Sequence, residues 1–151
     1  MMLLAFTLDD WRCALELSAV ERVYRAVAVT PLPDAPDIVL GVVNVRGVVL
    51  PVVDIRRRFR LPEKNLTPDD RLIIAHSTGR LVALVVDDVT GVIECAEKDI
   101  TSASAIVPSM EYVEGVARLK DGMILIHDLA RFLSLEEKAV LEQALGAVVQ
   151  A

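Results

Sequence analysis

Residues 41–59 read Gly41-Val-Val-Asn-Val-Arg-Gly-Val-Val-Leu-Pro-Val-Val-Asp-Ile-Arg-Arg-Arg-Phe59. Most of this stretch is aliphatic, which is typical of buried strands, yet Asn44 and Arg46 stand inside it. Burying an unpaired charge costs roughly several kcal/mol. Arg46 must therefore pair with a carboxylate, for which Asp54 and Glu21 are candidates, or lie at the surface where a partner can bind it.

The flanking sequence indicates an all-β fold. Short segments rich in Val, Ile and Leu are separated by turn residues, a spacing that favours small barrels or a sandwich. Asp9-Asp10 and Ser77-Thr78-Gly79 have the composition of hairpin turns. The expected strands are Leu3–Leu8, Cys13–Val23, Val42–Val45, Val48–Val53, Leu72–His76, Leu81–Val86, Val113–Leu119 and Met123–His127.

The chain also repeats itself weakly. Leu3–Val23 matches Leu72–Val92 at an offset of 69 residues, and Gly41–Arg57 matches Gly115–Arg131 at an offset of 74. Chance matches among Val and Leu are common, but the aligned Gly, Asp and basic positions favour duplication. The repeat predicts two related lobes, each made of a hairpin followed by a Gly-Val…Asp-Ile/Leu unit.

The expected boundaries follow from a polar, Pro-punctuated loop at Leu61–Asp70. Residues 1–140 are expected to form one domain, with lobes at roughly 9–70 and 71–134 and a first strand that can exchange between them. The tail, 135–151, is predicted to be a helix. Ser134 and Glu137 have the spacing of a capping box, and one helical face carries Leu141, Ala144, Leu145 and Val148.

Composition excludes several classes of protein. The net charge of −6 argues against nucleic-acid or anionic-membrane partners, which demand a positive surface. No apolar run approaches the roughly 18 residues of a membrane span, and the N-terminus lacks the basic residues of a signal peptide. We therefore expect a soluble cytoplasmic protein. Cys13 and Cys95 could form one disulfide, but buried free thiols are favoured.

The sequence offers no constellation of catalytic groups. It has no Gly-rich phosphate loop, and its two histidines and two cysteines lack a chelating spacing, so we expect no metal and no cofactor. His76 and His127 are interpreted as ordinary strand residues. The cluster Arg56–Arg60 is read as a short solvated helical turn in preference to an anion site. A binding module is favoured over an enzyme or small-molecule binder.

Residues Gly41–Phe59 closely resemble the signature of the CheW-like family, the coupling proteins of bacterial chemotaxis. Of that pattern's fixed positions, only Ile55 departs, replacing Leu. Cys13-Ala14 and His127 also differ from the usual aromatic-Gly and aliphatic residues of relatives. The resemblance covers nearly the whole chain and includes Phe6-Thr7-Leu8, Val86-Asp87-Asp88-Val89 and Glu114-Gly115-Val116.

The resemblance implies two SH3-like five-stranded β-barrel lobes plus a C-terminal α-helix, with a strand often exchanged between lobes. It implies a non-enzymatic adaptor that joins the regulatory domain of the histidine kinase CheA to methyl-accepting chemotaxis receptors. Such an adaptor is cytoplasmic, associates with receptor arrays at the inner membrane and can self-associate there. A scaffold for a different chemosensory or motility pathway is the alternative.

The resemblance also assigns a receptor site to the first lobe. Arg46 would supply a forked donor to receptor carbonyls or carboxylates, and glycine allows the backbone to turn tightly. Lys120 is the counterpart of Arg46 in the second lobe and lacks the flanking Asn and Gly, so we expect no second site. The receptor-binding positions carried over are Val20, Gly41, Asn44, Arg46 and Gly47, with Pro51 and Asp54 supporting the motif.

Overall fold

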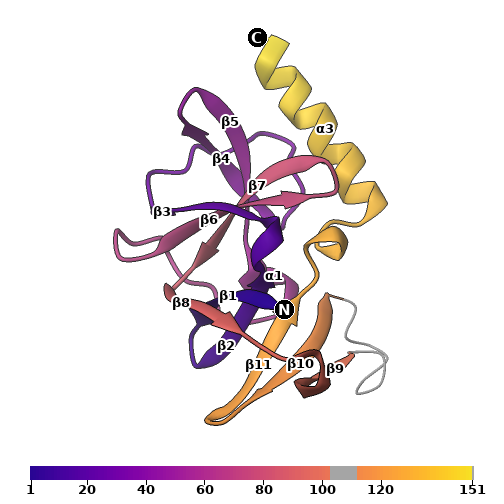
Figure 1. Ribbon diagram of the computed structural model, residues 1–151. Coiled ribbons are helices and arrows are strands. Elements are labelled where there is room, and N and C mark those ends of the chain that lie inside the picture. The colour runs from indigo at the N-terminus through magenta and orange to yellow at the C-terminus, as the bar shows by residue number, and fades with distance from the viewer. Residues whose placement is uncertain (103–111, 151) are drawn as a thin grey trace.

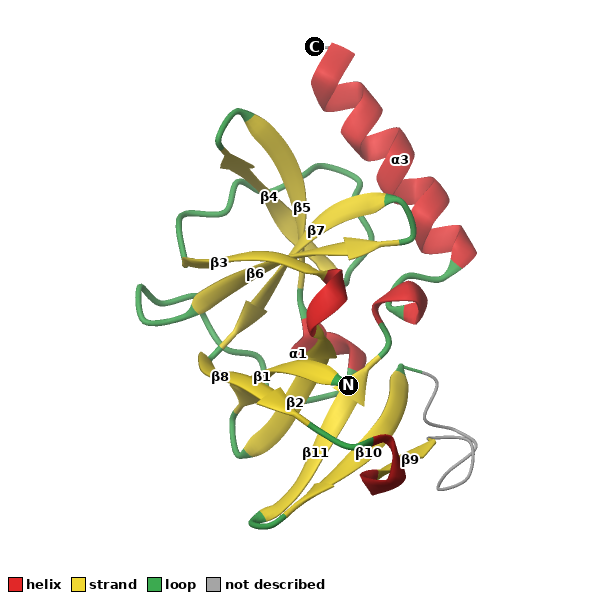
Figure 2. Cartoon of the chain, viewed as in Figure 1, coloured by secondary structure: helices red, strands yellow, loops and turns green. Residues whose placement is uncertain are grey.

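The computed structural model describes residues 1–102 and 112–150, and leaves out the side chains of residues 135 and 148–150. Its strands form two sheets, which Figure 1 shows one above the other with the C-terminal helix beside the upper sheet. Figure 2 shows how few helical segments interrupt the strands. The expected all-β fold with a C-terminal helix is confirmed.

Sheet A, the lower sheet in Figure 1, has the strand order β8-β1-β2-β11-β10-β9. It therefore combines the first two strands of the chain with the last four, and β2 pairs with β11 in parallel. Its strands are β1 (Met2–Leu8), β2 (Trp11–Glu16), β8 (Asp88–Glu94), β9 (Ile100–Ser102), β10 (Val113–Leu119) and β11 (Gly122–His127).

Sheet B has the order β3-β6-β7-β5-β4 and is built from one continuous part of the chain. Its β5 and β7 also pair in parallel. Its strands are β3 (Val20–Arg25), β4 (Val39–Val45), β5 (Val48–Val53), β6 (Arg71–Ser77) and β7 (Arg80–Val86).

Sheet membership divides the chain differently from the expected lobes 9–70 and 71–134. The β6–β7 hairpin belongs with β3, β4 and β5, whereas the β1–β2 hairpin joins the C-terminal strands. The single strand expected over Cys13–Val23 is wrong for the same reason. A 3-10 turn, η1 (Leu17–Ala19), interrupts it and carries the chain from sheet A to sheet B.

The predicted duplication is confirmed in the strand registers. Ala5 pairs with Ala14 as Ile74 pairs with Ala83, an offset of 69 on both strands. Val42 pairs with Pro51 as Val116 pairs with Leu125, at an offset of 74. The bulge at Val39/Gly41 recurs at Val113/Gly115. Each hairpin nevertheless pairs with the Gly-Val unit of the opposite repeat, so the repeats are interlocked.

The core consists of three clusters: one that extends between the sheets and under the C-terminal helix, and one on the opposite face of each sheet. Alternation along β1 shows why: Leu4, Phe6 and Leu8 point into the cluster between the sheets, whereas Leu3 and Ala5 point to the other side. A strand buried on both faces has to be apolar throughout. Cys13 and Cys95 are free and buried in different clusters, as expected.

The C-terminal helix α3 (Leu135–Gln150) begins with the predicted capping box. The backbone N–H of Glu137 donates to Ser134 Oγ at 3.0 Å, and the backbone N–H of Ser134 donates to Glu137 Oε1 at 2.9 Å. The predicted apolar face packs into the cluster between the sheets through Leu141, Ala144 and Leu145. The side chain of Val148 lies outside the described part.

Candidate functional site

The turn between β4 and β5 displays the polar pair of the opening stretch. Arg46 and Gly47 are its two central residues, and both have positive φ, 52° and 85°. That combination is typical of the tight type I′ hairpin turn. The backbone N–H of Gly47 donates to Oδ1 of Asn44 at 2.8 Å. Asn44 and Gly47 thus stabilise the turn that exposes the Arg46 side chain to solvent.

Arg46 is exposed and makes no ion pair with a described carboxylate. Glu21 instead contacts His76, with Oε2 at 3.6 Å from Nε2. The carboxylate of Asp54 accepts a hydrogen bond from the backbone N–H of Arg56 at 3.0 Å and contacts Arg57 at 3.5 Å. Neither candidate partner takes Arg46, so its guanidinium is available to another molecule.

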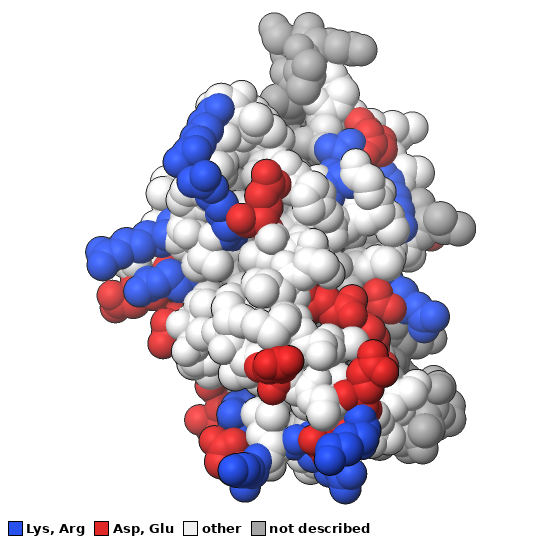
Figure 3. Space-filling view, viewed as in Figure 1, with Lys and Arg blue, Asp and Glu red and all other residues white. Residues whose placement is uncertain are grey.

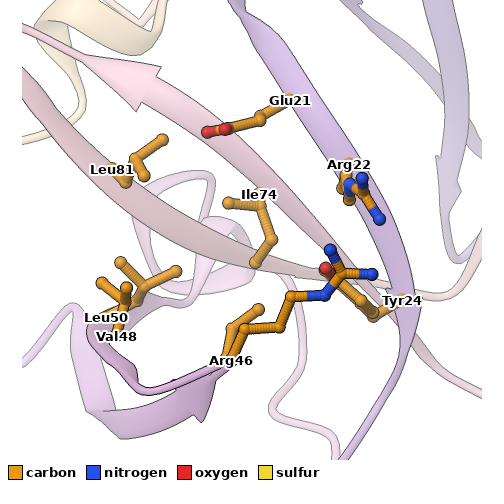
Figure 4. A pocket seen from close by; sticks show the side chains of 9 residues that line it. Glu21, Arg22, Tyr24, Arg46, Val48, Leu50, Ile74 and Leu81 are labelled. Carbon is orange, nitrogen blue, oxygen red and sulfur yellow. The ribbon is translucent and has the colours of Figure 1, made fainter.

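A cavity of about 220 Å³ opens beside this turn and is called the Arg46 pocket here. Its floor is apolar, and Figure 4 shows Arg46 reaching across from the turn toward Tyr24 and Arg22 on β3. An apolar floor with a charged rim is the usual composition of a protein-binding surface. The lining residues are Glu21, Arg22, Tyr24, Val45, Arg46, Val48, Leu50, Ile74 and Leu81.

The other residues expected at the site, Val20, Gly41, Pro51 and Asp54, do not line the Arg46 pocket. Val20 begins β3, pairs with Ala75 and packs against the cluster between the sheets. Gly41 is buried, and a Cβ there would lie 2.2 Å from the carbonyl oxygen of Thr30. Its geometry therefore supports close backbone packing. Pro51 is buried on β5.

Asp54 is the N-cap of the helical turn α1 (Ile55–Arg58). Burial raises its pKa, although the hydrogen bond from the backbone N–H of Arg56 opposes that effect. The structure thus groups Asn44, Arg46 and Gly47 on one turn and places Asp54 at the end of the same hairpin.

Comparison with known proteins identifies this framework. The family model described as the CheW-like domain matches residues 2–137. The chain belongs to the CheW family. It is 32% identical over 138 residues to the chemotaxis protein CheW of Rhizobium meliloti, covering 90% of this chain and 89% of that one. It is 30% identical to CheW of Bacillus subtilis, covering 94% of each chain.

A solved CheW structure has the same fold. The crystal structure of the scaffolding protein TtCheW from Thermoanaerobacter tengcongensis superposes with a TM-score of 0.82 at 29% identity, covering 90% of this chain and 94% of that one. The CheW family consists of scaffolds that act in chemotaxis, and this chain shares that role at the level of the family. In the described residues, no helix meets the length and apolarity of a membrane span.

The last arginine of the family motif, Arg56, joins the two sheets. Its side chain is 7% exposed, and Nη2 lies 2.8 Å from Oδ1 of Asp9 and 2.7 Å from Oδ1 of Asp87. Burial opposes the ionisation of Asp87, but hydrogen bonds from Arg56 and from the backbone N–H of Asp9 hold its pKa below the usual value. Asp9 lies in the β1–β2 turn, so this contact fastens sheet A to α1.

The sequence did not single out two parts of this arrangement. The interpretation of Arg56–Arg60 as a solvated turn is wrong for Arg56, which is buried, and Arg58, whose Nη2 lies 2.5 Å from Oε1 of Glu137. Two pocket residues on β3 were not predicted: Arg22 falls inside the expected strand Cys13–Val23, and Tyr24 lies just beyond it. Charged residues along an exposed edge strand were the available signal.

Proposed function

We propose that this protein is a non-enzymatic adaptor that couples methyl-accepting chemotaxis receptors to the histidine kinase CheA. An adaptor acts in the cytoplasm, at receptor arrays on the inner membrane, and can associate with itself there. The single observation that carries the proposal is the exposed, unpaired Arg46, held by Asn44 and Gly47 over an apolar pocket within the family motif.

The Arg46 pocket is proposed as the receptor site. A receptor helix would place an apolar side chain on Leu50 and Ile74, while Arg46 donates to its carbonyls or carboxylates. Gly41 contributes by holding residues near Thr30 close to β4, and Val20 by fixing the start of β3.

A second surface is proposed for the regulatory domain of the kinase. Trp11 and Met123 are 53% and 65% exposed. They lie side by side at one end of sheet A, because the parallel register pairs Cys13 with Leu125 two residues further along. Adjacent exposed large apolar side chains suit a protein contact. This end belongs to sheet A, whereas the Arg46 pocket belongs to sheet B, so both partners can bind together.

Binding measurements with two partners test this proposal. Wild-type protein should bind a receptor cytoplasmic fragment and a CheA regulatory domain, and Arg46→Ala should weaken receptor binding by about tenfold, or about 1.4 kcal/mol. Kinase binding should be unchanged by Arg46→Ala and weakened by Trp11→Ser. Lys120→Ala is the matched control, because Lys120 is the counterpart of Arg46 in the other repeat.

Two results would contradict the proposal. Failure of the wild-type protein to bind either partner at tens of micromolar would remove the adaptor function. Loss of folding in Arg46→Ala, seen by circular dichroism, would show that Arg46 is structural.

A further inference from the structure

The strand β8 forms an open edge of sheet A. It stands at the end of the strand order, and among the described residues it pairs only with β1. None of its seven residues is buried, and Val92 is 50% exposed. In Figure 1, β8 lies below sheet B and no other strand is drawn along its outer side. An open edge presents backbone groups with which another strand can pair.

Hydrogen bonds to Met1 show which backbone groups of β8 face outward. The backbone N–H of Cys95 donates to the carbonyl oxygen of Met1, and the amine of Met1 donates to the carbonyl oxygen of Cys95, both at 2.9 Å. In an antiparallel pair, such doubly bonded positions alternate with positions that point away from the partner strand. Ile93 therefore bonds to β1 as Cys95 does. The N–H and C=O groups of Val92 and Glu94 point instead to the open edge.

The outward-facing part of the edge is short and partly apolar. A bulge breaks the register of β8 with β1 between Val89 and Gly91, so Val92 and Glu94 are the regular outward positions. Met2 lies opposite Glu94 on β1 and is 46% exposed. Its side chain is on the same face of the sheet as that of Val92. An added strand would therefore cover exposed apolar side chains as well as unpaired backbone groups.

The equivalent edge of the other repeat has the opposite charge. At the offset of 69, Val92 and Glu94 correspond to Val23 and Arg25 on β3, which is likewise an end strand of its sheet. Both edges have an exposed valine, 50% for Val92 and 39% for Val23. Two positions further along, one edge has a glutamate and the other an arginine. The two edges therefore favour partners of opposite charge.

The charges around β8 decide which kind of strand can pair with it. Asp88 and Glu94 are exposed, and neither β8 nor β1 contains a lysine or an arginine. The 3-10 turn η2 (Glu97–Asp99) that follows adds two acids and one lysine. In Figure 3, blue side chains gather at the upper left, over sheet B, whereas the charged side chains across the middle of this face are red. Pairing two β8 edges would bring these acids together, so a basic strand is favoured.

We propose that the open edge of β8 binds an extended segment of a partner protein by strand addition, and that this segment carries basic side chains on both sides of an apolar one. Its backbone pairs with Val92 and Glu94, its apolar side chain lies beside Val92, and its basic side chains face Glu94 and Asp88. The inference is independent of the proposed function, because these residues neither line the Arg46 pocket nor belong to the surface of Trp11 and Met123.

A nuclear magnetic resonance titration with a defined peptide tests the edge. The probe is acetyl-Lys-Thr-Val-Thr-Lys-amide at millimolar concentration, and acetyl-Glu-Thr-Val-Thr-Glu-amide is the control. The lysine peptide should shift the amide signals of Val92 and Glu94, slow the exchange of these amides with solvent and bind less well at high salt. Equal effects of the two peptides, or none at these two amides, would overturn the proposal.

Two substitutions separate the backbone contribution from the charge. Val92→Pro removes an outward N–H and no bond to β1, so it should weaken binding of the lysine peptide at least tenfold, whereas Val92→Thr should retain binding. Glu94→Arg should reverse the preference in favour of the glutamate peptide, and the matched control Glu97→Arg, outside the strand, should not. An unreversed preference in Glu94→Arg would contradict the proposal even where Val92→Pro fails to fold.

Sedimentation of the protein alone tests whether a second copy takes the edge. Val92→Pro should leave the mass of the protein unchanged at the concentration of the titration. A doubled mass in the wild type that Val92→Pro abolishes would overturn the proposal, because the edge would then be an interface between copies of this chain.

Discussion

The two interlocked repeats share a framework and differ in what they add to it. Asp54 caps α1 and contacts Arg57 at 3.5 Å, and Asp128 caps η3 and contacts Arg131 at 3.4 Å, both pairs at the offset of 74. These duplicated contacts close the same β-hairpin in each repeat. Residues that recur in both repeats therefore specify the fold.

The two repeats carry different residues at positions that face the rest of the protein or the solvent. In the second repeat, the turn counterpart of Gly47 is Asp121, which accepts a hydrogen bond from Arg12 at 3.1 Å. The first repeat leaves Arg46 without a described partner. Arg56, which joins the sheets, has Ala130 as its counterpart. Residues found in only one repeat thus serve contacts outside the hairpin, and substitutions at them separate fold from function.

The largest loss of stability is expected for Arg56→Ala. Removing the guanidinium leaves Asp9 and Asp87 facing one another with only Lys64, 3.4 Å from Asp87, as a counter-charge. Breaking such a contact should lower the free energy of unfolding by roughly 2–4 kcal/mol, allowing for the partial exposure of both acids. Urea unfolding measures the effect. The control, Arg131→Ala, removes an exposed arginine from the equivalent turn and should cost less than about 1 kcal/mol. Equal losses would show that Arg56 does not join the sheets.

His127 is expected to make the free energy of unfolding depend on pH. Val53, the residue at the equivalent position of the first repeat, has no titratable group. Between pH about 6.5 and about 4 the unfolded chain protonates His127 and the folded chain does not. The free energy of unfolding therefore falls as the pH falls through this window, by up to about 3 kcal/mol. His127→Leu should remove this loss, measured by urea unfolding at several pH values.

Subtracting the two pH curves isolates His127. Asp54 and Glu114 also have raised pKa values, and both proteins retain them. The pKa of Asp87 is lowered, so its contribution to stability is lost only at more acidic pH. The exposed His76→Gln is the control. A wild-type curve that His127→Leu leaves unchanged would contradict the prediction.

The smallest of the three losses of stability is expected at the two glycines beside the β-bulges, Gly41 and Gly115. A Cβ at Gly41 would lie 2.2 Å from the carbonyl oxygen of Thr30, and one at Gly115 would lie 2.7 Å from that of Thr101. Gly41→Ala should therefore lower stability by about 1–3 kcal/mol, and Gly115→Ala by less. Thermal unfolding ranks the two. The reverse order would mean that the first repeat tolerates displacement of the segment carrying Thr30.

The sequence predicted the duplication and most strands because these depend on local patterns. The offsets of 69 and 74 reappear in the registers, and the capping box at Ser134 and Glu137 forms as expected. The exchange of the β1–β2 hairpin could not be predicted from those patterns. That hairpin and β6–β7 carry the same alternation, so each could pair with either Gly-Val unit.

The part of the candidate site that lies within a single sequence segment could be predicted. Asn44, Arg46 and Gly47 lie within the motif, and their turn follows from their spacing. The partners of Arg56 are Asp9, which had the composition of a hairpin turn, and Asp87, and both are distant from Arg56 in sequence.

The assignment of β1 and β2 to sheet A imposes an order on folding during synthesis. Residues 20–86 contain every strand of sheet B, so that sheet can form while the ribosome still holds the C-terminal part. The β1–β2 hairpin emerges before both of its neighbours, because β8 follows only after the last strand of sheet B and β11 later still. Such distant pairing is slow, and an apolar hairpin with open edges is prone to aggregate. A nascent chain that stops before His127 therefore exposes its own N-terminal strands.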